Sequence, residues 1–369
     1  MKKLVLIIGF IFSYQVNAST CSWPEWEQFK STYIQNSRVI DGSDTRQITT
    51  SEGQSYGLFF ALVANDPTTF KAMLNWTETH LAGGDLTARL PAWLWGKNDL
   101  NTFDVLDNNP ASDSDLWIAY SLIEAGRLWG EYYYESLGYL LASRILREET
   151  REVEGIGTVL LPGRKGFDNG KGQLRLNPSY VPLFLIKNMA SHYPNDQWQS
   201  LYNSSYTMLE NTMPKGFSPD WVTLSNTMFY ADAETGPIGS YNAIRTYLWA
   251  GMLNDKTEEK LTLLSMMSPM VNAIKQLQAP PRSVNTETGT FKEGGSAGFS
   301  AALLPLLQSL GEKELAIEQA KLVSISLHSN SNDYYYDNVL ALFGMGWYQG
   351  KYQFGVNGEL QPFWVEQCQ

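Results

Sequence analysis

Two carboxylic acids stand at the starts of strongly apolar segments, Glu52 in TTSEGQSYG and Asp113 in DNNPASDSDLW. One interpretation is that these acids merely cap helices, because Thr49-x-x-Glu52 and Ser112-x-x-Asp115 have the spacing of capping pairs. Each could also exchange a proton with a ligand, since positioned carboxyl groups act as general acids and bases. The spacing alone leaves both interpretations open.

Other kinds of catalytic chemistry lack their residues. The three histidines, His80, His192 and His328, are expected at or near the ends of the outer helices described below, away from these acids, which argues against zinc or a histidine-activated nucleophile. The acids following Asp107 lack the glycine turn and the final glutamate of a calcium loop. The chain also has no phosphate-binding loop and no dinucleotide fingerprint. We therefore expect no metal and no cofactor.

The composition favours an uncharged ligand. With a formal net charge of −11, the chain should repel nucleic acid and anionic lipid surfaces. It contains 12 Trp and 20 Tyr; most must be core, but sugar rings stack well on aromatic faces. Carboxylates facing each other across an aromatic groove predict glycoside hydrolysis, in which one carboxyl protonates the leaving oxygen and the other activates water or attacks directly.

The first 18 residues have the pattern of a secretory signal peptide. Lys2 and Lys3 precede an apolar run at 4–12, and Val16-Asn17-Ala18 resembles a cleavage site. We therefore expect cleavage near Ala18 and a periplasmic or secreted protein. No other apolar run is long enough to cross a bilayer, so membrane insertion is not expected.

Two cysteines lie at opposite ends of the mature chain, Cys21 and Cys368. An oxidising compartment would allow them to form a disulfide that joins the termini, and two unpaired thiols are the alternative. We expect residues 19–369 to form a single domain and the protein to be a monomer.

Six segments repeat one pattern, in which a polar, mostly Gly-, Ser-, Asn- or Asp-containing start leads into a helix that is apolar nearly all round, as buried helices are. They are SEGQSYGLFFALV from Ser51, SDSDLWIAYSLIEAG from Ser112, NPSYVPLFLIKNMA from Asn177, GSYNAIRTYLWAGM from Gly239, GFSAALLPLLQSL from Gly298 and YYYDNVLALFGMGW from Tyr334. More polar helices with one apolar stripe alternate with them. These begin at Trp23, Thr68, Tyr132, Asp196, Glu258 and Lys313.

This alternation predicts an all-α fold, an (α/α)6 barrel of six inner and six outer helices. The loops that enter the inner helices are mostly long and those that leave them are short, so the long loops should gather at the N-terminal ends of the inner helices. Polar residues at those ends should then converge on one cleft. The segment IGTVLLPGRKGF from Ile156 predicts a small β-hairpin at the rim.

Seven ordered motifs resemble glycoside hydrolase family 8 over essentially the whole mature chain. They are TTSEGQSYGLFFAL, LPAWLWGK, ASDSDLWIAYSLIEAGRLW, NPSYVPLF, KGFSPDW, SYNAIRTYLW and GFSAALLPLLQ. Within the family the resemblance is to periplasmic endo-β-1,4-glucanases found with bacterial cellulose synthase. It implies an (α/α)6 barrel, an inverting mechanism and cellulose or another β-1,4-glucan as substrate, with the synthase and export machinery as further partners.

The resemblance also assigns residues. It makes Glu52 the general acid and Asp113 the residue that grips the distorted sugar before the scissile bond. The positions matching residues that line or order the cleft are Trp95, Tyr180, Tyr241, Arg245 and Tyr335. Among these, Tyr180 is expected to hold the attacking water.

Asn242 departs from the family pattern, which has aspartate as the general base in the SY-x-AIR motif. Asparagine can orient water but cannot accept its proton at neutral pH. Three explanations remain: an introduced Asp→Asn change, transfer of the role to Glu234 or Asp232, or natural loss of most catalytic power. We therefore expect an inverting endoglucanase, with a catalytically impaired glucan-binding protein that assists cellulose export as the alternative. The related polymers chitosan and xylan remain alternative substrates.

Overall fold

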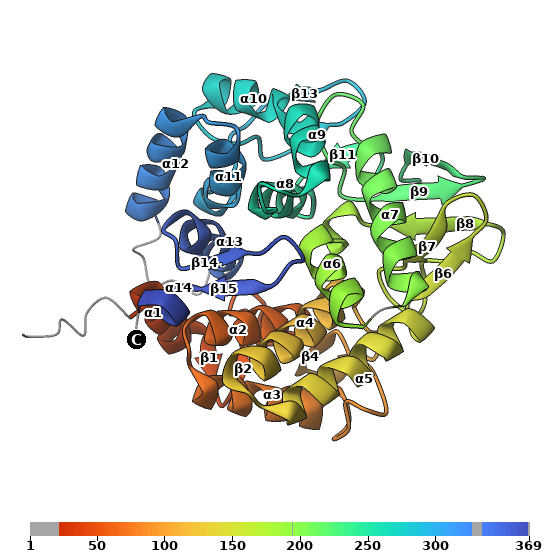
Figure 1. The fold of residues 1–369 in the computed structure, drawn as a ribbon, viewed down its shortest axis with the longest axis vertical. Helices are drawn as coiled ribbons and strands as arrows, with labels where there is room; N and C mark the ends of the chain where they lie inside the picture. Colours follow the sequence, from red (N-terminus) through yellow and green to blue (C-terminus); the bar gives the residue numbers. More distant parts are fainter. Residues whose placement is uncertain (1–21, 194, 327–333, 368–369) are drawn as a thin grey trace, which may run out of the picture.

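The computed structural model describes residues 22–193, 195–326 and 334–367, and their helices form two concentric rings (Figure 1). The inner ring comprises α2 (Ser51–Val63), α4 (Ser112–Trp129), α6 (Leu183–His192), α8 (Ala243–Met252), α11 (Ala297–Ser309) and α13 (Tyr335–Tyr348). The outer ring comprises α1 (Pro24–Tyr33), α3 (Pro67–Leu81), α5 (Tyr132–Glu148), α7 (Asp196–Asn211), α9 (Glu258–Met267) with α10 (Pro269–Leu277), and α12 (Lys313–Ser326). The predicted (α/α)6 barrel is confirmed. Cys21, Cys368 and the signal segment lie outside the described residues.

Prolines account for two departures from the predicted helices. The third inner segment begins with a 3-10 turn, η2 (Pro178–Tyr180), and α6 starts only after Pro182. The fifth outer segment is two helices, because Pro269 cannot donate the backbone hydrogen bond that would continue α9. In addition, α8 starts at Ala243, so that Asn242 occupies its N-cap position.

Most strands lie in the long loops that enter the inner helices, and all strand pairs are antiparallel. The sheets are β1 (Ile34–Gln35) with β2 (Arg38–Val39); β3 (Thr49–Thr50), β4 (Leu94–Lys97) and β5 (Phe103–Asp107); β6 (Thr150–Val153) with β7 (Gly157–Leu160); β8 (Gln173–Leu176), β9 (Val222–Ser225) and β10 (Met228–Ala231); β11 (Ile238–Gly239), β12 (Val284–Asn285) and β13 (Thr290–Phe291); and β14 (Tyr352–Phe354) with β15 (Leu360–Pro362). The predicted hairpin is present as β6–β7, but its first strand lies upstream of Ile156. The sequence did not predict the other sheets.

The hairpin β14–β15 runs across the middle of the ring in Figure 1. Tyr120 of α4 donates its hydroxyl to Gly358 O at 2.8 Å, and Tyr352 donates to Phe343 O of α13 at 2.9 Å. Leu360 N–H donates to the buried carboxylate of Glu124 at 2.8 Å. Because Glu124 lies in the C-terminal half of α4, the hairpin closes the end of the barrel opposite the long loops.

Aromatic rings fill the axis of the barrel. Trp117 of α4 lies 5.9 Å from Tyr56 of α2, 5.3 Å from Trp249 of α8 and 5.2 Å from Phe343 of α13, measured between ring centroids. Such contacts add to the stabilisation that burial gives. The barrel core therefore uses much of the aromatic surplus seen in the sequence.

Glycine lets inner helices approach backbone to backbone. A Cβ atom on Gly344 of α13 would overlap the Ala301 carbonyl oxygen of α11, and one on Gly251 of α8 would overlap the backbone at Leu306. The neighbouring atoms are backbone and cannot turn aside, so only glycine fits these two contacts.

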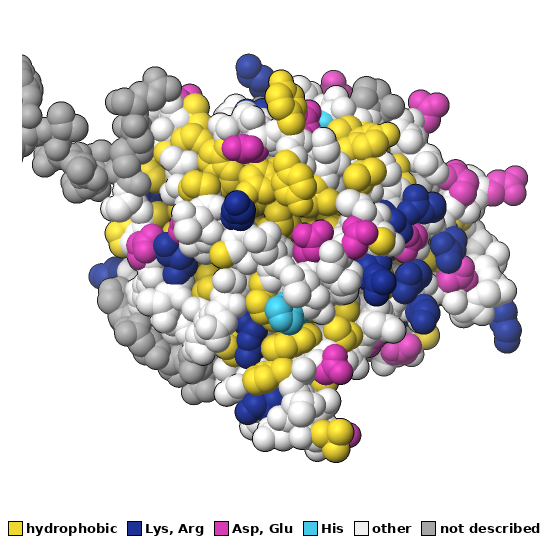
Figure 2. All heavy atoms as spheres, turned by 90° about the horizontal axis from the view of Figure 1, so that it is seen from below, with side chains coloured by type: hydrophobic (Ala, Val, Ile, Leu, Met, Phe, Trp, Pro, Cys, Tyr) yellow, Lys and Arg dark blue, Asp and Glu magenta, His cyan; other side chains and the backbone are white. Residues whose placement is uncertain are grey.

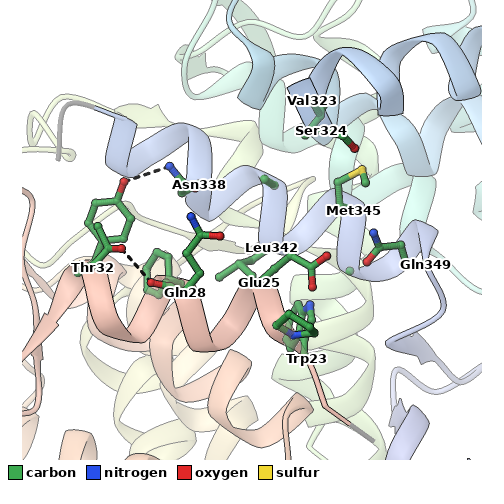
Figure 3. A pocket seen from close by; sticks show the side chains of 15 residues that line it. Trp23, Glu25, Gln28, Thr32, Val323, Ser324, Asn338, Leu342, Met345 and Gln349 are labelled. Atoms are coloured by element: carbon green, nitrogen blue, oxygen red, sulfur yellow. Dashed lines mark hydrogen bonds between the residues drawn. The ribbon is translucent and has the colours of Figure 1, made fainter. Parts of the chain in front are cut away.

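A cavity of about 250 Å³ lies in the wall where α1 meets α12 and α13 (Figure 3). Asn338 of α13 donates to the Tyr33 hydroxyl of α1 at 3.0 Å beside it. None of the predicted site residues lines this cavity, so it marks the junction of the first and last helical pairs rather than the expected cleft.

The surface is not uniformly acidic. Figure 2 shows one face on which hydrophobic side chains form a broad patch and basic side chains gather to one side of it. Exposed apolar residues of α5 include Tyr132, Tyr133, Tyr139 and Leu140. None of the helices in the described ranges is both long enough and apolar enough to span a membrane.

A buried pair of carboxyl groups joins the start of α4 to the end of α5. Asp115 and Glu149 are both fully buried, and their four oxygens accept no hydrogen bond from any other described residue. The two groups are hydrogen-bonding neighbours of each other. Two carboxyl groups can bond only when one carries a proton, so the pair shares a proton. Burial raises the pKa of both groups well above the ordinary range, and the charge of nearby Asp113 raises both further.

This pair predicts that the protein loses stability as pH rises above the ordinary carboxyl range. The folded chain keeps a proton that the unfolded chain releases, so the free energy of unfolding should fall by about 1.4 kcal/mol per pH unit while the pair retains that proton. In Asp115→Asn the amide can donate to Glu149, and no shared proton is needed. Urea unfolding between pH 5 and 8 should therefore show a shallower slope for this variant than for the wild type. Equal slopes would contradict a shared proton; exposed Asp99→Asn serves as the control.

Candidate active site

The guanidinium of Arg245 gathers the polar residues at the N-terminal ends of the inner helices. Arg245 is buried in α8, and its Nη1 donates to the carboxylate of Glu52, to the Tyr56 hydroxyl at 2.9 Å and to Asp113 Oδ2 at 3.2 Å. Its Nη2 donates to Asn242 Oδ1 at 2.9 Å. The predicted convergence of Glu52, Asp113, Asn242 and Arg245 is therefore found in the structure.

Glu52 does not act as the helix cap that its spacing suggested. Thr50 caps α2 by accepting the Gly53 N–H at 3.0 Å, while the Thr49 hydroxyl donates to Val39 O. The side chain of Glu52 is left free to meet Arg245 and is 27% exposed. A ligand in the cleft can therefore reach this carboxyl group, and the capping interpretation is wrong.

Asp113 is enclosed beside Glu52. Its Oδ1 accepts the N–H of Ser114 at 2.7 Å, and no side chain caps α4, so the predicted Ser112-x-x-Asp115 cap is also wrong. Burial, together with the negative charge of Glu52, raises the pKa of Asp113 to about 7, although Arg245 opposes the shift. Asp113 and Glu52 therefore share one cation, because both carboxylates bind Nη1 of Arg245.

The amide of Asn242 has a fixed orientation. Its Oδ1 accepts from Arg245 and from Asn177 Nδ2 at 3.1 Å. Asn177 is itself oriented, because its Oδ1 accepts the N–H and hydroxyl of Ser179. Asn242 therefore keeps only its Nδ2 group for another partner, and that nitrogen has no hydrogen bond to the described residues. It can donate to a ligand or water but cannot accept a proton.

Three of the predicted cleft aromatics surround this cluster. The ring of Tyr180 lies 5.7 Å from the Arg245 guanidinium. Tyr241 directly precedes Asn242 and is 48% exposed. Tyr335 is buried, and its hydroxyl lies so close to Gly53 that a Cβ there would approach it to 2.6 Å. Only Tyr241 of these three offers a broadly exposed ring.

Trp95 is placed differently from the expectation. It is only 9% exposed, stacks on Phe103 with ring centroids 4.8 Å apart and lies 4.7 Å from the guanidinium of Arg38. Trp93 is more exposed, at 36%, and its carbonyl accepts the N–H of Ser51 at the start of α2. Trp93 was not among the residues predicted from the sequence. Trp93 and Trp95 of WLW would share one face of a regular strand, so the choice of Trp95 could have pointed to Trp93 as well.

Neither predicted replacement base lies in the cluster. Arg175 of β8 donates to both oxygens of Asp232, at 2.9 and 3.0 Å, and pairs with Glu234 at 2.8 Å. Burial by itself would raise the pKa of Asp232, but Arg175 and Thr235 hold it below the ordinary value. Glu234 is 70% exposed. Within the described residues, no hydrogen bond or ion pair joins either carboxylate to Asn242.

Asp220, in the KGFSPDW motif, is the acid beside Asn242 that the sequence reasoning missed. Its Oδ1 accepts the N–H groups of Ser240, Asn242 and Ala243 at 2.9, 2.9 and 2.7 Å. Burial raises the pKa of Asp220 despite these three bonds. The motif offered a signal, but its position 22 residues before Asn242 gave no hint of contact.

The histidines lie outside this cluster as far as they are described. His80 is in the last turn of α3 and stacks on Trp76. His192 ends α6, an inner helix rather than the predicted outer one, and His328 falls outside the described residues. In the described part of the chain, no group of three His, Cys, Asp or Glu side chains is placed to hold a metal ion.

The sequence profile of the glycosyl hydrolases family 8 matches residues 4–350. An endoglucanase of Escherichia coli strain K12 is 45% identical over 370 residues, which cover 100% of this chain and 98% of the relative. An endoglucanase of Salmonella typhi is 46% identical over 356 residues, with 96% and 94% covered. The solved structure of an endo-1,4-D-glucanase from Vibrio fischeri ES114 has a TM-score of 0.89 and 55% identity, covering 94% of this chain and 100% of that one. The chain therefore belongs to glycosyl hydrolase family 8.

Proposed function

We propose that this protein is an inverting endo-β-1,4-glucanase that hydrolyses cellulose or soluble β-1,4-glucan, with Glu52 as general acid. The observation that carries the proposal is the Arg245 cluster, which brings Glu52 and Asp113 together at the long-loop end of a family 8 barrel. Relatives named endoglucanase over nearly the full length support the substrate class.

The cluster suits the first half of the reaction. Glu52 reaches the cleft and can deliver a proton to the leaving glycosidic oxygen. Asp113 lies beside it as the group that grips the sugar before the scissile bond. Tyr180, 5.7 Å from the Arg245 guanidinium, is the residue we propose to hold the attacking water, while Tyr241 and Trp93 have exposed rings on which sugars can stack.

The same cluster favours a second candidate, a catalytically impaired glucan-binding protein that assists cellulose export. The observation behind it is that Asn242 has both its oxygen bonds taken by donors and only N–H groups left. Removing a general base costs on the order of 10² to 10⁴ in rate, whereas stacking and hydrogen bonding to glucan do not need it. Binding would therefore outlast turnover.

The cellular setting proposed here rests on the sequence. The pattern from Lys2 to Ala18 supports cleavage near Ala18 and a periplasmic or secreted protein. That residues 19–369 form a single-domain monomer stays a prediction. Cellulose biosynthesis is the proposed context, with the glucan chain as ligand and the synthase and export machinery as further partners. The net charge of −11 supports the expectation that nucleic acid is not a partner.

The first test is release of reducing ends from carboxymethylcellulose by the mature chain. Glu52→Gln should lower the rate about 10² to 10⁴-fold, because glutamine cannot deliver a proton. Glu154→Gln, in the exposed turn of the β6–β7 hairpin, is the matched control and should change nothing. NMR of the first product formed should show an inverted anomer. An unchanged rate in Glu52→Gln would remove Glu52 from the acid role, and a retained anomer would exclude inversion.

Asn242→Asp separates the two candidate functions in the same assay. A gain of about 10² to 10⁴-fold from a barely measurable wild-type rate would identify an impaired hydrolase or binding protein. A wild-type rate that already matches the variant would mean that another group serves as base.

The pKa of Asp113 predicts the alkaline side of the activity profile. Because burial and the charge of Glu52 raise that pKa to about 7, Asp113 holds a proton below pH 7 and loses it above. A neutral Asp113 can donate a hydrogen bond to the sugar that it grips and a charged one cannot, so kcat/KM should fall above about pH 7, approaching tenfold per pH unit. Profiles from pH 5 to 9 with a soluble cello-oligosaccharide would show it. Asp113→Asn should move the midpoint; a midpoint that stays in place would locate the proton elsewhere.

A further inference from the structure

We propose that Asp220 is the general base of this enzyme and that its Oδ2 takes the proton from the water held beside Asn242. The proposal rests on the endoglucanase function above. It names a residue that neither the spacing of the motifs nor the position of the usual aspartate indicates.

The backbone at the start of α8 fixes the position of Asp220. Three N–H groups, from Ser240, Asn242 and Ala243, bind its Oδ1, so the carboxylate lies directly against the residue that occupies the base position. Oδ2 accepts no hydrogen bond from the described residues, and it is not among the fully enclosed polar atoms. One oxygen is therefore clamped, and the other remains open to a water molecule.

Of Asp220, Asp232 and Glu234, only Asp220 both lies beside Asn242 and has an oxygen with no hydrogen bond to the described residues. Both oxygens of Asp232 are bound by Arg175, and Glu234 is held by the same arginine on the surface. Asp220 is close enough to the cluster for its charge to act on Arg245 and on Tyr336. Burial raises its pKa, while Arg175 and Thr235 hold that of Asp232 down, so Asp220 is also the better proton acceptor.

With Asp220 as base, each role in the hydrolysis step has a residue. Asn242 donates an N–H to the water oxygen and holds it, which its free Nδ2 permits. The water oxygen attacks the anomeric carbon as the bond to the leaving oxygen breaks. One proton of the water passes to Asp220 Oδ2, and Glu52 gives its proton to the leaving oxygen. Each bond and proton is accounted for, and the anomer is inverted.

Four mature chains test this role in the carboxymethylcellulose assay: wild type, Asp220→Asn, Asn242→Asp and the double variant. Asparagine at 220 keeps the Oδ1 acceptor that caps α8 but cannot take a proton. We expect Asp220→Asn to lower the wild-type rate about 10² to 10⁴-fold. In the Asn242→Asp background the same change should cost less than about tenfold, because the carboxylate introduced by that substitution then supplies the base. Thermal unfolding of each variant checks that α8 is intact.

Azide gives a readout that a merely structural residue would not move. It is an anionic nucleophile that needs no deprotonation, so it should restore turnover to Asp220→Asn and yield a glycosyl azide of inverted configuration. It should give no such product with Glu52→Gln.

Three outcomes would overturn the role of Asp220 while leaving the endoglucanase function in place. They are an unchanged rate in Asp220→Asn, an equal loss in both backgrounds, and an inactive wild type that Asn242→Asp makes active. Absence of hydrolysis in all four chains would overturn both proposals together.

Discussion

One buried cation, the guanidinium of Arg245, joins the site residues at the N-terminal ends of the inner helices. Taking a charge out of water costs several kcal/mol unless partners surround it. Here Glu52 and Tyr56 come from α2, Asp113 from α4 and Asn242 from the cap of α8. Because each partner stands at the start of an inner helix, the charge balance of the site and the arrangement of these helices depend on each other.

A closely packed aromatic core lies below this cation. Trp117, Trp249 and Phe343 fill the axis directly beneath the polar layer, and the β14–β15 hairpin closes the far end. The Arg245 cluster lies above this core, where the inner helices begin, while the buried Glu124 at the opposite end accepts the N–H of Leu360. The Asp115–Glu149 pair has no such donor among the described residues, and a shared proton takes its place.

The sequence predicted the features that depend on local pattern and missed those that depend on where loops fold. Inner and outer helices alternate in hydrophobicity, so both rings were predictable, as was the meeting of Glu52, Asp113 and Asn242 at the starts of the inner helices. Arg245 was assigned to the cleft only by the family resemblance. Asp232 was chosen because it lies close to Asn242 along the chain, but an arginine from β8 binds it. Asp220 is farther away in sequence and nearer in space, because the loop before α8 folds back onto the helix start. No periodic pattern in the sequence predicts that this loop folds back onto the start of α8.

The electrostatics around Arg245 give a reason why asparagine is tolerated at position 242. Glu52 and Asp113 already outnumber the single cation, and burial together with the charge of Glu52 raises the pKa of Asp113. An aspartate at this position would place a third carboxyl group on the same guanidinium, and like charges at this distance favour proton uptake. Asparagine offers Arg245 and Asn177 the same oxygen without that charge. Asparagine in place of aspartate therefore keeps the hydrogen bonds and avoids the repulsion between carboxylates. It also removes a proton acceptor, and Asp220, which lies outside the guanidinium cluster, can take over that role.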